Sequence, residues 1–242
     1  MLGIVGAGNM AGALARGWGE PVLATDSGSG RSQQLVDELG GESLGTDNAE
    51  LFRRCDTILL GHKPYQLQQV AAQVDGADKT VISVLGATTV ADLQAAYPDS
   101  TVVRAMPNTP VAIRRGVTCI ATGGESAVAL FERVGRVFVV PEAQMEVATS
   151  AMGVTPAYVA LIAEASIDAA VRNGLKADLA TDIFLAALAG SAELLQARGG
   201  DTLAVRREVT SPGGSTARGL AALERNGLRT AFDEATRAVL GQ

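Results

Sequence analysis

Two glycine-containing strings, near opposite ends of the chain, could bind anions through backbone amides. The first, Gly6-Ala7-Gly8-Asn9-Met10-Ala11, has the pattern G-x-G-x-x-A, and the second, Pro212-Gly213-Gly214-Ser215-Thr216, precedes an apolar helical pattern. Glycine permits tight turns and a close approach of the backbone to a ligand, and the amides at a helix start attract negative charge. The first string therefore predicts a phosphate site. The second predicts either a carboxylate site, to which Ser215 and Thr216 add hydroxyl groups, or a plain helix-capping loop.

Side chains for acid-base or metal chemistry are scarce in this sequence. His62 is the single histidine, so no Ser-His, Cys-His or His-metal arrangement can be built around other imidazoles. The two cysteines, Cys55 and Cys119, lie far apart without metal-ligand spacing, which predicts reduced thiols and no metal site. Catalysis, if present, must depend on a bound cofactor.

The first string has the sequence context of a dinucleotide-binding turn. An apolar run precedes Gly6, a helical pattern follows Gly8, and Asp26 ends the next apolar run. Gly6 permits the turn, Gly8 lets the backbone approach a pyrophosphate, and Ala11 lets the helix pack closely on the sheet. Asp26 could accept hydrogen bonds from a ribose 2′-hydroxyl, as in NAD binding, whereas residues 27–31 could bind the 2′-phosphate of NADP. The cofactor is predicted to be NADPH or NADH.

The elements that must position these strings alternate in type over the first part of the chain. Short β-branched or Leu-rich runs alternate with helical patterns, and helix-capping residues precede two of the helical segments, 48–54 and 89–96. This alternation of strand and helix patterns predicts an α/β fold with a mostly parallel sheet covered by helices on both faces. The predicted strands are 2–5, 22–25, 57–60, 80–85, 101–104, 117–121 and 136–140.

The second part of the chain, after Pro141, reads as helix throughout. Helical periodicity extends through 144–173, 177–198, 201–209, 215–226 and 228–240. These helices are apolar over faces too wide for about 100 residues to bury alone, which favours association with another chain. We therefore predict a dinucleotide-binding Rossmann-type domain at 1–141 and an all-helical dimerisation and substrate domain at 142–242.

Composition and charge exclude several classes of partner. The chain has 242 residues, 47% hydrophobic and 19% charged, with a net charge of −6 and no long basic run. Such a chain is globular, and nucleic acid is an unsuitable partner. The uninterrupted apolar runs are shorter than the roughly 18 to 20 residues needed to cross a bilayer, which predicts a cytoplasmic protein that makes no membrane contact.

Three further strings, together with the opening turn, give the chain a resemblance to the Δ1-pyrroline-5-carboxylate reductase family over nearly its whole length. They are Lys63-Pro64 at a strand end, Arg104-Ala105-Met106-Pro107-Asn108-Thr109-Pro110, and Val209-Thr210-Ser211-Pro212-Gly213-Gly214-Ser215-Thr216, the family signature. The resemblance implies a reductase that converts a cyclic imino acid to proline with a hydride from NAD(P)H. It also implies a homodimer, allows assembly into a decamer, and allows an active site built from both chains.

The resemblance also implies roles for individual residues. The loop 209–216 would hold the substrate carboxylate, with Gly214, Ser215 and Thr216 as catalytic residues and the Thr216 hydroxyl beside the ring nitrogen. The implied cofactor-binding residues are Gly6, Ala7, Gly8, Asn9, Met10, Asp26, Ser27, Asn48, His62, Lys63, Pro64 and Leu85. No residue is implied to bind a metal.

Several positions depart from the family pattern near the expected reaction centre. Met152 and Val154 stand where the family has small or hydroxyl residues, Leu85-Gly86-Ala87 replaces Ala-Ala-Gly, and Gly61-His62 replaces Ala-Val. Bulkier residues at 152 and 154 would narrow the substrate pocket, shift the substrate or abolish turnover. Two alternatives to the reductase therefore stay open: a non-catalytic, dinucleotide-binding regulatory paralogue, and an imine reductase for another cyclic imine.

Overall fold

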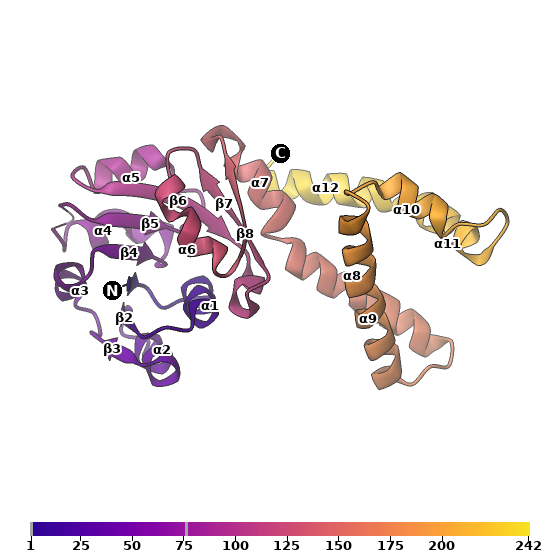
Figure 1. Ribbon diagram of the computed structural model, residues 1–242, viewed down its shortest axis with the longest axis horizontal. Coiled ribbons are helices and arrows are strands. Elements are labelled where there is room, and N and C mark those ends of the chain that lie inside the picture. The colour runs from indigo at the N-terminus through magenta and orange to yellow at the C-terminus, as the bar shows by residue number, and fades with distance from the viewer. Residues whose placement is uncertain (1, 76) are drawn as a thin grey trace. The chain divides into compact units, whose positions relative to one another are not determined.

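The computed structural model describes residues 2–75 and 77–242 and divides into two compact units. One unit ends at Pro156 and the other comprises Ala157–Gln242 (Figure 1). The first unit is α/β and the second is all-helical, which confirms the predicted fold class.

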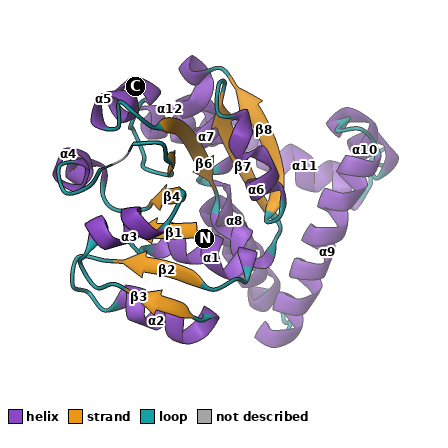
Figure 2. Ribbon diagram, turned by 60° about the vertical axis from the view of Figure 1, so that its left-hand side comes forward, coloured by secondary structure: helices purple, strands orange, loops and turns teal. Residues whose placement is uncertain are grey.

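Eight strands among the described residues of the first unit form one sheet in the order β3-β2-β1-β4-β5-β6-β7-β8 (Figure 2). The strands are β1 Leu2–Val5, β2 Val22–Thr25, β3 Gly41–Ser43, β4 Thr57–Leu60, β5 Thr80–Ser83, β6 Thr101–Pro107, β7 Gly116–Ala121 and β8 Gly135–Val140. Seven of them lie at predicted positions. β3 was not predicted because Gly41-Glu42-Ser43 is short, polar and largely exposed.

Neighbouring strands are parallel except for β6 and β7, which pair antiparallel. The chain between them, residues 108–115, holds only a 3₁₀ turn at Thr109–Ile113. A parallel connection needs a crossover of a dozen or more residues, so this link is too short for one. The prediction of a mostly parallel sheet is confirmed, with one reversal that the link length explains.

Helices cover both faces of the sheet, because successive strand residues point to opposite sides. Ile4, Leu59 and Ile82 are buried in one core cluster, which α1 and α2 close. Val5, Ile58 and Leu60 are buried in a second cluster, which α3, α4 and α5 close. The helices of this unit are α1 Asn9–Trp18, α2 Arg31–Leu39, α3 Asn48–Arg54, α4 Leu67–Ala71, α5 Val90–Ala96, α6 Val128–Glu132 and α7 Met145–Met152.

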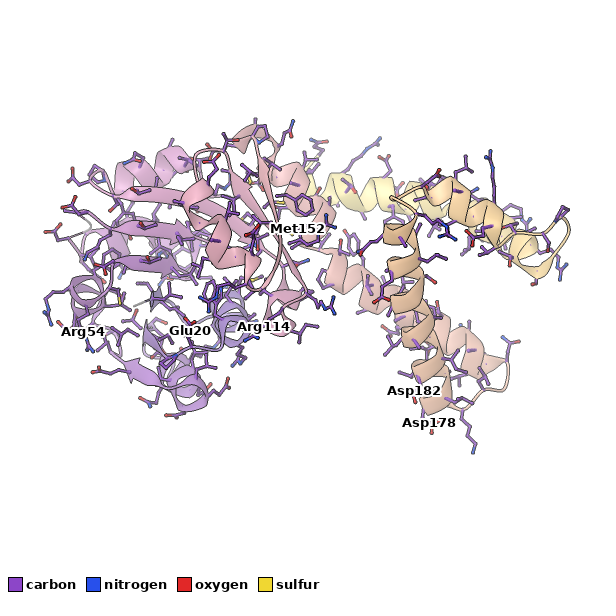
Figure 3. All side chains as sticks on the ribbon, in the orientation of Figure 1. Glu20, Arg54, Arg114, Met152, Asp178 and Asp182 are labelled. Atoms are coloured by element: carbon purple, nitrogen blue, oxygen red, sulfur yellow. The ribbon has the colours of Figure 1, made fainter. Side chains whose placement is uncertain are left out.

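Met152, labelled in Figure 3, is the last residue of α7. Its side chain is 9% exposed and belongs to a buried cluster with Cys119 and Met145. Asn108 fixes this helix end by donating from Nδ2 to the Met152 carbonyl at 3.1 Å and accepting from the Val117 amide at 2.8 Å. Core packing thus accounts for this departure from the family pattern.

The predicted helical segment 144–173 is two helices rather than one. α7 ends at Met152 and α8 begins at Thr155, with Gly153 and Val154 between them. Pro156 lies at the second position of α8, where a missing amide hydrogen costs nothing. The break between the two helices therefore falls next to a glycine and a proline, Gly153 and Pro156.

The second unit consists of helices with little buried surface. Within residues 157–242, all of which the structure describes, only Ala163 and Ala180 are buried. Large apolar side chains are exposed instead, among them Leu161 at 64% and Ile183 at 52%. The helices of this unit are α8 Thr155–Arg172, which begins two residues before the unit boundary, α9 Ala177–Ala197, α10 Thr202–Glu208, α11 Ser215–Arg225 and α12 Leu228–Leu240.

The stretch of residues 142–172, which contains both α7 and α8, is long and apolar enough to cross a membrane by length and composition alone. Its most apolar part has a mean hydropathy of 1.4. The prediction of no membrane contact was based on the length of apolar runs that contain no charge. An isolated charge such as Glu164 interrupts such a run but does not end an apolar helix. Length and composition do not distinguish a membrane span from a helix that packs on another protein chain.

Candidate cofactor and substrate sites

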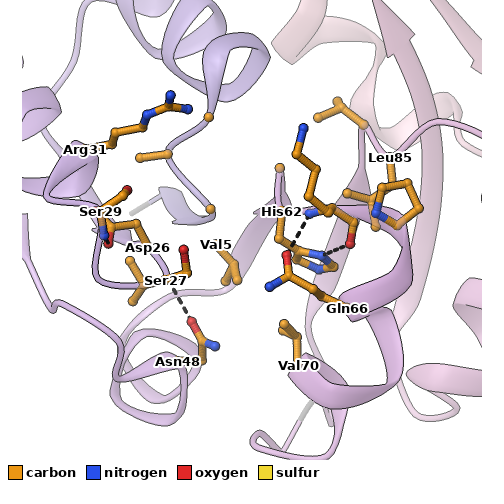
Figure 4. Close-up of a pocket in the computed structure, with 18 of the residues that line it drawn as sticks. Val5, Asp26, Ser27, Ser29, Arg31, Asn48, His62, Gln66, Val70 and Leu85 are labelled. Atoms are coloured by element: carbon orange, nitrogen blue, oxygen red, sulfur yellow. Dashed lines mark hydrogen bonds between the residues drawn. The ribbon is translucent and has the colours of Figure 1, made fainter.

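A pocket of about 810 Å³ lies along the carboxyl ends of β2, β1, β4 and β5. Ligands of open α/β sheets bind at this edge, and the volume suits a large organic ligand. All twelve residues predicted to bind the cofactor line this pocket: Gly6, Ala7, Gly8, Asn9, Met10, Asp26, Ser27, Asn48, His62, Lys63, Pro64 and Leu85. Figure 4 shows Asp26, Ser27, Ser29 and Arg31 on one side of the pocket and His62, Gln66 and Leu85 on the other.

The middle of the pocket is the turn from β1 into α1. Gly6 has φ +89°, and Gly8 is the N-cap of α1 with no side-chain capping bond and no acidic residue in the first turn. The amides at the start of this ten-residue helix are therefore free to bind an anion. A Cβ at Gly61 would lie 2.6 Å from the Ala11 Cβ, so α1 packs tightly on β4, as predicted.

Asp26 shapes the loop that leads into α2. Its Oδ1 accepts from the amides of Gly28 at 2.6 Å and Ser29 at 2.8 Å, and its Oδ2 accepts from Ser32 at 2.7 Å. Burial raises the pKa of the Asp26 carboxyl, but these hydrogen bonds outweigh it and hold the pKa below its ordinary value. The carboxylate is thus committed to fixing the loop, and Ser27, Ser29 and Arg31 line the pocket beside it.

Asn48 connects the two walls of the pocket near Asp26. Its Oδ1 accepts from the Thr25 hydroxyl at 2.7 Å, and its Nδ2 donates to Gln73 Oε1 at 2.7 Å. Thr25 ends β2, Asn48 begins α3 and Gln73 follows α4. Sequence reasoning found Asn48 through the family pattern, but it missed Thr25 and Gln73 because their contacts join residues more than 20 positions apart.

His62 lies at the other end of the pocket. Burial lowers the pKa of its imidazole below the ordinary value, more than the hydrogen bond with the Lys63 carbonyl raises it. The Nδ1 atom lies 2.9 Å from that carbonyl oxygen, and the buried Nε2 has no partner among the described residues. Gln66 Oε1 accepts from the Lys63 amide at 3.0 Å and was not predicted as part of the site.

The loop 209–216 leads into α11 in the second unit. Gly213 has φ +68°, Gly214 is the N-cap, and a Cβ at Gly214 would lie 2.5 Å from the Ser211 Oγ. The first turn of α11 contains no acidic residue, and within the described residues no hydrogen bond is recorded for the exposed Ser215 and Thr216 hydroxyls. This helix start can bind a carboxylate through its amides.

Two features support a ligand role for this loop rather than simple capping. The Thr210 hydroxyl is buried and has no hydrogen-bond partner among the described residues. The Arg218 guanidinium donates to the Gly213 carbonyl at 2.7 Å and so fixes the turn. A buried polar atom without a partner is uncommon in proteins and often marks a place where a ligand or water binds.

The fold and the pocket define a dinucleotide-binding protein of the Rossmann class with a separate helical unit. Residues 1–87 match the family model described as NADP oxidoreductase coenzyme F420-dependent, and residues 142–242 match the model described as pyrroline-5-carboxylate reductase dimerisation. The chain is 36% identical to the pyrroline-5-carboxylate reductase of Synechocystis sp., over 98% of this chain and 94% of that protein. It therefore belongs to the pyrroline-5-carboxylate reductase family of NAD(P)H-dependent oxidoreductases.

Solved structures of this family have the same fold. The Plasmodium falciparum pyrroline carboxylate reductase with NADP bound is 28% identical, with a TM-score of 0.86 over 98% of this chain and 94% of that chain. The Streptococcus pyogenes 1-pyrroline-5-carboxylate reductase is 25% identical, with a TM-score of 0.88 over 100% of this chain and 98% of that chain. These similarities confirm the family that the sequence motifs indicated.

Proposed function

We propose that this protein reduces Δ1-pyrroline-5-carboxylate to proline with NAD(P)H, and that the predicted site residues carry this reaction. The observation that carries the proposal is the pair of uncapped helix starts, at α1 and α11, in a member of this reductase family. One suits a pyrophosphate and the other a carboxylate, which are the anionic groups of the cofactor and the substrate.

The pocket residues fit a nicotinamide dinucleotide. The amides of Asn9 and Met10 would bind the pyrophosphate, because no side chain caps them and no Cβ at residue 8 blocks the approach. The Gly8 amide instead donates to the Gly6 carbonyl at 2.8 Å and holds the turn. Residues 26–31 would hold the adenosine end, and His62, Lys63, Pro64 and Leu85 would line the nicotinamide end. When bound, NAD(P)H supplies the hydride for the reduction of the C=N bond.

The chain's own residues have to orient the substrate rather than act as strong acids or bases. The amides of Ser215 and Thr216 would bind the carboxylate of the cyclic imino acid, whereas the Gly214 amide donates to the Ser211 carbonyl at 3.1 Å and holds the turn. The Thr216 hydroxyl would accept a hydrogen bond from the protonated ring nitrogen, which makes the neighbouring carbon electrophilic. Orientation of this kind accounts for large rate accelerations without an acid-base side chain, which agrees with a sequence that has one histidine.

The experiment that tests this proposal is the oxidation of NADPH or NADH on addition of Δ1-pyrroline-5-carboxylate. We expect oxidation that depends on both enzyme and imine. Tight dinucleotide binding without turnover would favour the regulatory paralogue, and turnover of other cyclic imines alone would favour the broader imine reductase. Either result would contradict the proposed substrate.

We propose further that NADPH is preferred over NADH. Asp26 already accepts three backbone amides, whereas Ser27 and Ser29 offer hydroxyls and Arg31 is exposed at the first position of α2. Arg31 takes part in no ion pair recorded among the described residues, so its charge is available to a 2′-phosphate.

Replacing Arg31 by alanine is expected to lower kcat/KM for NADPH by about tenfold or more, because one charge-assisted hydrogen bond contributes about 1.5 to 3 kcal/mol. The NADH value should change by less than about twofold, since NADH has no 2′-phosphate. Steady-state kinetics with both cofactors measures the two effects. Equal losses of kcat/KM for both cofactors would show that the 2′-position of the adenosine ribose does not lie beside Arg31.

We propose that the exposed apolar helices of residues 142–242 form the interface of a homodimer. Leu161, Ile183 and Leu185 are each about half exposed or more, which is unusual for large apolar side chains gathered in one region. The matching family model carries the description of a dimerisation domain. On this proposal the segment 142–172 packs on the partner chain rather than in a membrane, and dimers are able to join into a decamer.

Sedimentation equilibrium in detergent-free buffer is expected to give twice the chain mass of 24.8 kDa, or a multiple of the dimer. A monomer, or a protein that stays dispersed only in detergent, would contradict this proposal. The cytoplasmic location and the domain boundary at 141/142 remain predictions from the sequence.

A further inference from the structure

The string Arg104–Pro110, one of those shared with the reductase family, has no part in the reaction as proposed so far. None of its residues lines the dinucleotide pocket. Its first four residues end β6, and its last two begin the 3₁₀ turn at Thr109–Ile113. Two of its polar side chains, Arg104 and Asn108, are nevertheless almost fully buried, at 3% and 6% exposed. Buried polar side chains of this kind bind specific partners in the fold.

Arg104 holds the start of α7, and the turn before it, against β6. Its guanidinium forms an ion pair with Glu142 at 3.5 Å and another with Glu146 in the first turn of α7. Glu142 Oε1 also accepts a hydrogen bond from the Val90 amide at 2.5 Å, at the first residue of α5. The start of α7 is therefore fixed to two neighbouring elements of the first unit.

Asn108 holds the other end of α7. In a continuous helix the Met152 carbonyl would accept from the amide four residues later, but that residue is Pro156, which has no amide hydrogen. Asn108 Nδ2 supplies the missing donor at 3.1 Å, and Asn108 Oδ1 accepts from the Val117 amide of β7 at 2.8 Å. The side chain thus ties the end of α7 to the sheet through a carbonyl that the proline leaves without a helical partner.

The end of α7 lies next to the place where the chain leaves the first unit. Two residues separate it from α8, and the boundary between the two units falls after Pro156. The chain crosses this boundary once, so α8 is the covalent link to the unit that carries the loop 209–216. The direction in which the chain leaves α7 therefore affects where that loop is carried.

We propose that Asn108 is a positioning residue of the reductase, which sets the direction of the chain at the end of α7 and thereby aligns the substrate loop with a nicotinamide. This inference rests on the proposed function, because it concerns hydride transfer between groups that different units bind. Such transfer needs the reacting atoms about 3 to 3.5 Å apart, and a displacement of about 1 Å lowers the rate by about 100-fold. Asn108 would contribute without lining the cofactor pocket.

The test uses Asn108→Asp, which keeps the shape and the acceptor for the Val117 amide but loses the donor to the Met152 carbonyl. At saturating NADPH and imine, kcat should fall about 10- to 100-fold. The dissociation constant of NADPH should stay within about twofold, because distant sites act independently. The deuterium isotope effect on kcat, measured with NADPH labelled at C4, should rise because the misaligned hydride step limits the rate. Asn108→Ala, which buries no charge, should show the same pattern.

Trp18→Phe is the matched control. It removes the hydrogen bond from Trp18 Nε1 to the Leu130 carbonyl at 2.9 Å, which is another long-range contact of a side chain with a carbonyl in the first unit. It should lower the melting temperature but leave kcat and the isotope effect unchanged. Hydrogen exchange gives a readout without turnover: the amides of residues 149–155 should exchange faster in the Asn108 variants than in the parent, and at the parent rate in Trp18→Phe.

Four results would overturn the inference. Unchanged kcat in both Asn108 variants would show that the reaction does not depend on this contact, while the proposed function stands. Unchanged exchange at residues 149–155 would show that Asn108 does not hold the end of α7. A parallel loss of NADPH affinity, or an equal loss of kcat in Trp18→Phe, would show that Asn108 acts through the stability of the fold. A parent enzyme that reduces no imine would refute the proposed function and this inference with it.

Discussion

Replacing Gly8 by alanine is expected to weaken NADPH binding at least about tenfold, a loss of about 1.4 kcal/mol. The reason is that a Cβ at residue 8 lies where the backbone would contact the pyrophosphate. The free energy of unfolding should change by less than about 0.5 kcal/mol, because such surface changes rarely cost more. Gly8 has φ −76°, and the nearest atom to an added Cβ is the Gly61 carbonyl oxygen at 3.4 Å, an ordinary contact.

Gly6→Ala is the matched variant and should lose both stability and binding. Its φ of +89° is strained for alanine, and the added Cβ would lie 2.5 Å from the His62 amide nitrogen and 2.7 Å from the His62 Cα. Strain of this kind costs about 1 to 3 kcal/mol, and overlap with backbone atoms adds to it. Urea denaturation and NADPH fluorescence titration separate the two effects. A Gly8→Ala protein that binds NADPH as tightly as the parent would show that the pyrophosphate does not lie on this turn.

Replacing Thr216 by alanine is expected to lower kcat/KM for the imine about 100-fold, the usual loss when one positioned hydrogen-bonding group at the reacting atoms is removed. The affinity for NADPH should not change, since Thr216 belongs to the loop 209–216 and not to the dinucleotide pocket. Stability should also be unaffected, because the described residues record no hydrogen bond of its exposed hydroxyl.

Thr216→Ser is the control for this prediction, because it keeps the hydroxyl and removes only a methyl group. It should retain most of the activity that Thr216→Ala loses. If kcat/KM and NADPH affinity fall together in Thr216→Ala, the residue acts through the fold and not at the substrate. If Thr216→Ser is as impaired as Thr216→Ala, the hydroxyl is not the group that matters.

Sequence patterns predicted the architecture well wherever the physical signal is local. The buried parallel strands are continuous apolar runs, so β1, β2, β4 and β5 begin and end within a few residues of their predicted limits. β3 lacked this signal because it is a polar edge strand. The break between α7 and α8 has a local signal in Gly153 and Pro156, but the apolar periodicity on both sides suggested one continuous helix.

The part of the candidate site that comes from one local sequence motif was also predicted, whereas contacts between distant elements were not. Gly6, Gly8 and Asp26 were found through a spacing that reflects one βαβ unit, and the structure places all three in one pocket. Side-chain partners that come from different elements have no such spacing: Gln73 contacts Asn48 only because α3 and α4 pack on the same core cluster. The sequence likewise could not predict that the Asp26 carboxylate binds the amides of its own loop. A carboxylate that caps the loop and one that binds the ribose occupy the same position of the motif.

The most direct test of the central claim is to follow the transferred hydrogen. With NADPH deuterated at C4 of the nicotinamide on the transferring face, the enzyme should convert Δ1-pyrroline-5-carboxylate to proline that carries one deuterium at carbon 5, detected by mass spectrometry and NMR. Proline formation should equal NADPH oxidation mole for mole. Bound NADPH with no labelled proline, or proline without deuterium for either face of the label, would contradict the assignment of this protein as a pyrroline-5-carboxylate reductase.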